Sequence, residues 1–100
     1  MAARPPLSVV IITLNEERDL PRCLKSVSWA PEILVVDSGS TDRTRELAQA
    51  AGAKVLQHKW EGYGQQKNWA LGQISQPWVL FLDADEEVTP ALREEIEAFL

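Results

Sequence analysis

The stretch Leu7-Ser8-Val9-Val10-Ile11-Ile12-Thr13 decides the fold class of this 100-residue chain. It is rich in β-branched residues and almost wholly apolar, which is typical of a strand buried on both faces of a parallel sheet. Three further apolar runs of strand length follow, at residues 33–36, 53–57 and 78–82. Segments of helical spacing separate them, so the sequence predicts an α/β fold.

The predicted helices follow the strands at residues 20–27, before Gly52, at 65–74 and at 90–100. Asp19 is placed as the N-cap of the first, with Pro21 in its first turn. Alternating strands and helices pair in parallel through right-handed crossovers. We therefore expect a Rossmann-like, doubly wound, mostly parallel sheet of about four strands with helices on both faces. Because residues 78–82 are apolar on both faces, they predict a central strand, with a fifth strand beyond residue 100.

Composition excludes several classes of protein. The net charge of −5 argues against a nucleic-acid-binding protein. The single cysteine and single histidine exclude an internal disulfide and a four-ligand zinc site built from these two residue types. No apolar stretch approaches the roughly 20 residues of a membrane span. We expect a cytoplasmic protein, acting at the inner face of the membrane in its full-length form.

Doubly wound sheets bind ligands beyond the carboxyl ends of their strands, where the strand order reverses. Asp83-Ala84-Asp85 stands at such an end. Residues two apart on a strand point to the same side, roughly 6.6 Å apart at about 3.3 Å per residue. Two carboxylates there suit Mg²⁺, which uses one or two carboxylates together with substrate phosphates. The alternative interpretation is a solvated acidic turn.

Other polar residues follow the remaining strands. Asp37 could accept a hydrogen bond from a base or a ribose hydroxyl, or organise its own loop. Asn15 and Glu16 could contact the ligand or cap the first helix. Lys67 follows a glycine-containing loop at a helix start, where it could meet a diphosphate. Trp60 could form an aromatic platform for a sugar or base, or anchor its loop by packing.

Taken as a set, these motifs resemble the N-terminal half of the family 2 glycosyltransferases, and in particular the bacterial lipopolysaccharide core-biosynthesis members. The matching stretches, in order, are residues 8–17, 33–42, 67–68 and 78–86. The resemblance implies the GT-A fold, with residues 1–100 as its nucleotide-sugar-binding part and the acceptor-binding half beyond residue 100.

The resemblance also implies roles for individual residues. Donor base and ribose contacts fall to Thr13, Asn15, Glu16 and Asp37. Lys67 lies near the diphosphate in this interpretation. Asp83 and Asp85 contact the ribose and a Mg²⁺ or Mn²⁺ ion. The family's general base corresponds to no residue within 1–100.

The predicted activity is inverting, metal-assisted transfer of a sugar from a nucleotide-sugar donor, with UDP-sugar preferred, to an acceptor hydroxyl. The acceptor would be a carbohydrate or lipid-linked saccharide in lipopolysaccharide or other surface-polysaccharide synthesis. These 100 residues alone should be inactive. The alternative is a noncatalytic nucleotide-binding or interaction domain. A haloacid-dehalogenase-type phosphotransferase is disfavoured, since Glu87 stands where that family needs Thr or Val.

Overall fold

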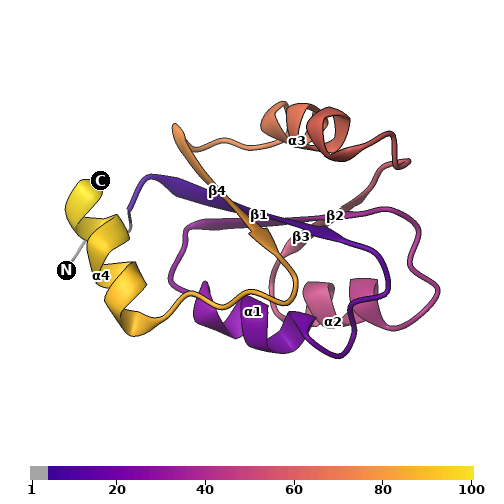
Figure 1. Ribbon diagram of the computed structural model, residues 1–100, viewed down its shortest axis with the longest axis horizontal. Coiled ribbons are helices and arrows are strands. Elements are labelled where there is room, and N and C mark those ends of the chain that lie inside the picture. The colour runs from indigo at the N-terminus through magenta and orange to yellow at the C-terminus, as the bar shows by residue number, and fades with distance from the viewer. Residues whose placement is uncertain (1–4) are drawn as a thin grey trace.

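The computed structural model describes residues 5–100 of the chain (Figure 1). Strands and helices alternate throughout, as the sequence predicts. The strands are β1 (Leu7–Thr13), β2 (Glu32–Asp37), β3 (Lys54–Gln57) and β4 (Trp78–Asp83). The helices are α1 (Leu20–Ser26), α2 (Thr44–Ala50), α3 (Tyr63–Leu71) and α4 (Pro90–Phe99).

All four strands pair in parallel, in the order β3-β2-β1-β4. The chain adds β2 and β3 on one side of β1 and then places β4 on the other, so the strand order reverses at β1. In this register Thr13 lies opposite Asp37, and Ile12 lies opposite Asp83. The polar residues that end β1, β2 and β4 therefore meet at one edge of the sheet, and the predicted α/β fold is confirmed.

Helices cover both faces of the sheet (Figure 1). α1 and α2 lie on one face, where they share a core with alternate residues of the central strands, such as Val9, Ile11 and Val35. α3 lies on the other face, where Ala70 packs with Val10. Both faces of β1 are thus buried, which explains its nearly continuous apolar sequence.

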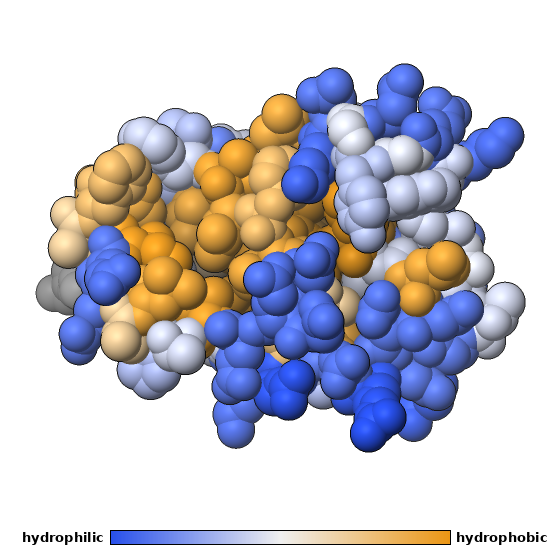
Figure 2. All heavy atoms as spheres, viewed as in Figure 1, coloured by the Kyte–Doolittle hydropathy of each residue, from blue (hydrophilic) through white to orange (hydrophobic). Residues whose placement is uncertain are grey.

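β4 occupies an edge of the sheet among the described residues, and the fifth strand predicted beyond residue 100 lies outside them. The two faces of β4 contribute to different cores. Leu80 and Leu82 pack on the α1 side, whereas Val79 and Phe81 pack on the α3 side. Figure 2 shows apolar surface gathered over β4 and α4.

Element boundaries differ from the sequence prediction by a few residues. α3 begins at Tyr63 and ends at Leu71, earlier than the predicted 65–74. Asp19 stands at the N-cap of α1, but its side chain makes no capping hydrogen bond. No helix within residues 5–100 is long and apolar enough to cross a bilayer.

Candidate nucleotide-sugar site

A cleft of about 420 Å³ opens at the carboxyl ends of β1 and β4, where the strand order reverses. Residues from four separate stretches of the chain form its walls. They are Ile12, Thr13, Leu14, Glu16, Asp19, Ser38, Trp60, Tyr63, Asp83, Ala84 and Asp85. Five of the residues selected from the sequence therefore lie around one cavity, as expected of the ligand site in a doubly wound sheet; they are Thr13, Glu16, Trp60, Asp83 and Asp85.

Asp83 and Asp85 form one side of the cleft, called here the acidic wall. Both side chains are exposed, whereas Ala84 between them is buried. A turn fixes this arrangement, since the Asp83 N–H donates to Glu86 Oε1 at 2.8 Å and the Glu86 N–H donates to Asp83 O at 3.0 Å. Neither carboxylate has a hydrogen-bond or ion-pair partner within residues 5–100. Both remain available to a ligand.

The acidic wall fits a divalent cation that is shared with a substrate. Within the described part of the chain, no three or more histidine, cysteine, aspartate or glutamate side chains cluster closely enough to hold a metal by themselves. Mg²⁺ typically takes one or two protein carboxylates and fills its other positions with water and substrate phosphates. Two unpartnered carboxylates beside a cleft are a suitable set of donors for such an ion.

The cleft carries a negative electrostatic potential. Of the described residues that line it, Glu16, Asp19, Asp83 and Asp85 are acidic and none is basic. The pKa of Glu16 is raised, first by burial and then by the nearby Asp85, Asp19, Asp42 and Asp83 carboxylates. An anionic diphosphate entering this cleft would be repelled unless a cation accompanied it.

Asp37 organises the loop that follows β2 and links it to the end of β1, next to residues that line the cleft. Its side chain is fully buried, and both carboxylate oxygens accept hydrogen bonds. The hydroxyls of Thr13 and Ser40 donate to Oδ1 at 2.8 and 2.5 Å, and the backbone N–H groups of Ser40 and Gly39 donate to Oδ2 at 2.8 and 3.1 Å. Burial alone would raise the pKa of Asp37, but these hydrogen bonds outweigh burial and keep that pKa below its usual value.

Asn15 links the β1–α1 loop to the β2–α2 loop. Its Oδ1 accepts a hydrogen bond from the Thr41 N–H at 2.8 Å, and its own backbone N–H donates to Ser40 Oγ at 2.8 Å. Asn15 has φ +54°, a left-handed conformation that asparagine tolerates better than most residues. The two loops thus hold each other in place. We call Thr13, Asn15, Asp37 and Ser40 the braced wall.

Three of the residues selected from the sequence do not line the cleft, and one of them, Asp37, takes the alternative role of organising its own loop. Asp37 and Asn15 are not among the residues that line the cleft, and their side-chain oxygens are already hydrogen-bonded. Lys67 also lies outside the lining residues, with Nζ 5.4 Å from the centre of the Phe81 ring. A direct contact between Lys67 and a diphosphate in the cleft would require its side chain to leave Phe81.

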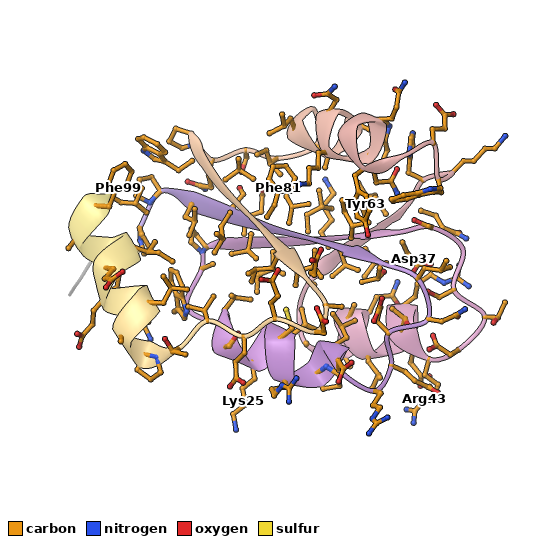
Figure 3. The ribbon with its side chains drawn as sticks, in the orientation of Figure 1. Lys25, Asp37, Arg43, Tyr63, Phe81 and Phe99 are labelled. Carbon is orange, nitrogen blue, oxygen red and sulfur yellow. The ribbon has the colours of Figure 1, made fainter. Side chains whose placement is uncertain are left out.

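Sequence reasoning did not select six of the residues that line the cleft, namely Ile12, Leu14, Asp19, Ser38, Tyr63 and Ala84. Leu14 and Ser38 directly follow the ends of β1 and β2, so their position in the chain was a usable signal. Tyr63 begins α3, and only the three-dimensional fold shows that this helix start reaches the cleft. In Figure 3, Tyr63 lies at the start of α3, on the same side of the molecule as Asp37.

Comparison with known proteins identifies the family. The family model described as glycosyl transferase family 2 matches residues 8–100, which is nearly the whole chain. The chain belongs to glycosyl transferase family 2. The match includes both walls of the cleft and confirms the resemblance that the motifs suggested.

Individual relatives of this family 2 chain agree. It is 48% identical over 99 residues to the lipopolysaccharide core biosynthesis glycosyltransferase LpsC of Rhizobium meliloti, covering 94% of this chain and 37% of LpsC. The crystal structure of S. aureus TarS residues 1–349 matches with a TM-score of 0.81 at 30% identity, covering 93% of this chain and 31% of the TarS chain. The chain thus spans about a third of the length of the proteins it resembles.

A third similar protein was solved with ligands bound. Mycobacterium tuberculosis glucosyl-3-phosphoglycerate synthase, in complex with Mn²⁺, UDP and glucosyl-3-phosphoglycerate, matches with a TM-score of 0.72 at 31% identity. The match covers 81% of this chain and 35% of that chain. The α/β fold of the family 2 chain is therefore that of solved glycosyltransferases.

Proposed function

We propose that this protein transfers a sugar from a nucleotide-sugar donor to an acceptor hydroxyl, and that residues 1–100 supply the donor-binding and cation-binding part of the enzyme. The observation that carries the proposal is the acidic wall, where the unpartnered carboxylates of Asp83 and Asp85 face a cleft at the reversal of strand order. Family membership supports it, as does the similar mycobacterial synthase, whose structure contains Mn²⁺ and UDP.

In this proposal the donor is a UDP-sugar, and Asp83 and Asp85 would hold Mg²⁺ or Mn²⁺ together with its diphosphate. The bound cation would offset the charge that develops on the departing nucleoside diphosphate. Thr13 and Glu16 contribute walls of the cleft, and Asp37 and Asn15 act by holding the two loops in place. Lys67 approaches the diphosphate if its side chain leaves Phe81.

We place the general base that deprotonates the acceptor outside residues 1–100, and we assign inversion at the transferred sugar to the complete active site. The acceptor is a carbohydrate or lipid-linked saccharide of lipopolysaccharide or another surface polysaccharide, by similarity to LpsC. Such an acceptor fits a cytoplasmic enzyme at the inner face of the membrane. Residues 1–100 alone should bind the donor without transferring sugar.

Titration of the purified protein with UDP, with and without Mg²⁺, tests the proposal. We expect UDP to bind with Mg²⁺ present and to bind at least tenfold more weakly with a chelator, because the acidic cleft repels the free diphosphate. Asp85→Asn should abolish this dependence on Mg²⁺. Glu94→Gln removes the same charge from an exposed position on α4, outside the cleft, and should leave binding unchanged.

Two results would contradict the proposal. If UDP binds equally well with Mg²⁺ and with chelator, and Asp85→Asn has no effect, the domain is a noncatalytic nucleotide-binding module. If UDP does not bind in either condition, the cleft is not a nucleotide site.

A further inference from the structure

The cleft has a third side that is aromatic and exposed. Trp60 and Tyr63, from the β3–α3 connection and the start of α3, line it with their ring centroids 4.8 Å apart and their planes at 89°. Trp60 is 43% exposed and Tyr63 is 63% exposed, and Leu14, which also lines the cleft, is 53% exposed. Binding sites for ligands are typically pockets in which several large apolar side chains are exposed to solvent.

The backbone between the two rings is shaped to present them together. Gly62 has φ +107°, in a region that favours glycine, and it is the N-cap residue of α3. Because the chain turns at Gly62, residues on either side of it can meet edge to face. The contact between Trp60 and Tyr63 therefore depends on the loop conformation at Gly62, which glycine adopts more easily than other residues.

Hydrogen bonds of the Gln66 side chain also hold the start of α3 in place. This side chain is fully buried, and its amide Nε2 donates to Ser38 Oγ at 3.2 Å and to the His58 carbonyl at 3.3 Å. Its Oε1 lies 2.7 Å from His58 Nδ1, and because both partners of Nε2 accept hydrogen bonds, Oε1 accepts from this ring nitrogen. Gln66 thus ties the aromatic side of the cleft to the ends of β2 and β3.

The same hydrogen bonds leave the hydroxyl of Ser38, which lines the cleft, able to donate to a ligand. Since the Ser38 hydroxyl accepts from Gln66, its own hydrogen has no acceptor among residues 5–100. This side of the cleft therefore offers flat apolar surfaces and one hydroxyl hydrogen. A planar nucleobase with a ring carbonyl matches that combination. A sugar ring, whose C–H face also packs on aromatic rings, is the competing occupant, and the comparison of UDP with UDP-glucose distinguishes the two.

We propose that Trp60 and Tyr63 hold the base of the donor nucleotide, one ring stacking on its face and the other meeting its edge, because the two ring planes stand at 89°. Leu14 lines the same cleft, and Ser38 donates to a base carbonyl. This inference rests on the proposed function, because it takes the ligand to be a nucleoside diphosphate whose diphosphate lies at the acidic wall. The base then occupies the aromatic side, and the transferred sugar extends elsewhere.

The test compares three ligands in the presence of Mg²⁺, namely UDP, UDP-glucose and inorganic pyrophosphate. Replacing an aromatic residue that stacks on a base weakens binding by about tenfold or more. We expect Trp60→Ala to weaken UDP and UDP-glucose by the same factor and to leave pyrophosphate unchanged. Trp60→Phe should restore most of the affinity, and Tyr63→Ala should repeat the effect of Trp60→Ala.

Trp78→Ala is the matched control. Trp78 is 48% exposed, similar to Trp60, but it begins β4 and lines a different, apolar hollow beside α4. It should leave binding of all three ligands unchanged.

Several outcomes would overturn the inference. A loss confined to UDP-glucose would assign Trp60 to the sugar, and an equal loss for pyrophosphate would show that the variant distorts the whole cleft. If UDP binding depends on Asp85 but is unaffected by both Trp60→Ala and Tyr63→Ala, only the aromatic inference fails. If the wild-type protein does not bind UDP, both the aromatic inference and the proposed function fail.

Discussion

The braced wall and the acidic wall of the cleft use the same kinds of side chain in opposite ways. Asp37 is buried and accepts four hydrogen bonds, one from Thr13 of β1 and three from its own loop, whereas Asp85 is exposed and has no partner within residues 5–100. The first aspartate shapes the cleft and the second remains available to a ligand. Residue type alone therefore does not assign a role, because the role depends on whether the hydrogen-bonding capacity of the side chain is already satisfied.

Asp37→Asn should have the largest effect on stability. In the variant, an NH₂ group replaces one carboxylate oxygen of Asp37, and this NH₂ cannot accept the hydrogen bonds that Ser40 donates there. At least one buried polar group therefore loses its partner. We expect the free energy of unfolding to fall by about 2 kcal/mol. Urea denaturation of the variant and the wild type measures the difference. A fall no larger than that of Asp85→Asn would show that the braced wall does not stabilise the fold.

The effect of Asp37→Asn should also depend on pH. The folded state lowers the pKa of Asp37, so the ionised carboxylate stabilises the fold fully above the unfolded-state value of about 3.9. That contribution is lost as the pH falls through the lower folded-state pKa. Unfolding curves of wild type and variant should therefore differ at pH 7 and converge in strong acid. A difference that stays constant from pH 7 to pH 2 would contradict this.

Asn15 allows backbone conformation to be separated from hydrogen bonding. Asn15→Ala loses the bond to the Thr41 N–H and also places alanine at φ +54°, so we expect a loss of about 1 kcal/mol. Asn15→Gly loses the same bond but accepts the backbone conformation, and it should cost less. Thermal unfolding of the two variants ranks them. If glycine is as harmful as alanine, the backbone conformation contributes nothing measurable.

Asp85→Asn should have the smallest effect on stability. The side chain is exposed and unpartnered, and it raises the pKa of Glu16 by repulsion. We expect the free energy of unfolding to change by no more than about 0.5 kcal/mol. Any change should increase stability, because the variant removes a negative charge that repels Glu16. The same denaturation experiment measures it. A large loss would mean that Asp85 has a structural role and would weaken its assignment as a cation ligand.

The sequence predicts the framework of the cleft well. Because parallel strands bring their carboxyl ends to one edge, an aspartate directly after an apolar run could be placed there without coordinates, and Asp83 and Asp85 were found in this way. The binding roles of these residues stay predictions until the ligand titrations are done.

The remaining features depend on contacts between distant segments. The full set of hydrogen bonds to Asp37 includes one from Thr13, whose position opposite Asp37 follows from strand register and not from local pattern. Gln66 reads in the sequence as one polar residue in a weak helical pattern, yet it is buried because it joins β2, β3 and α3. The packing of Lys67 on Phe81 likewise needs α3 and β4 to be placed together.

The position of β1 has a consequence for folding order. β1 is the first strand in the chain but lies inside the sheet, between β2 and β4. Leu7 pairs with Trp78, so most of the chain must be present before the second hydrogen-bonded ladder of β1 can close. Contacts this distant in sequence form slowly. The cleft, which needs the ends of both β1 and β4, should therefore be among the last parts of the molecule to form.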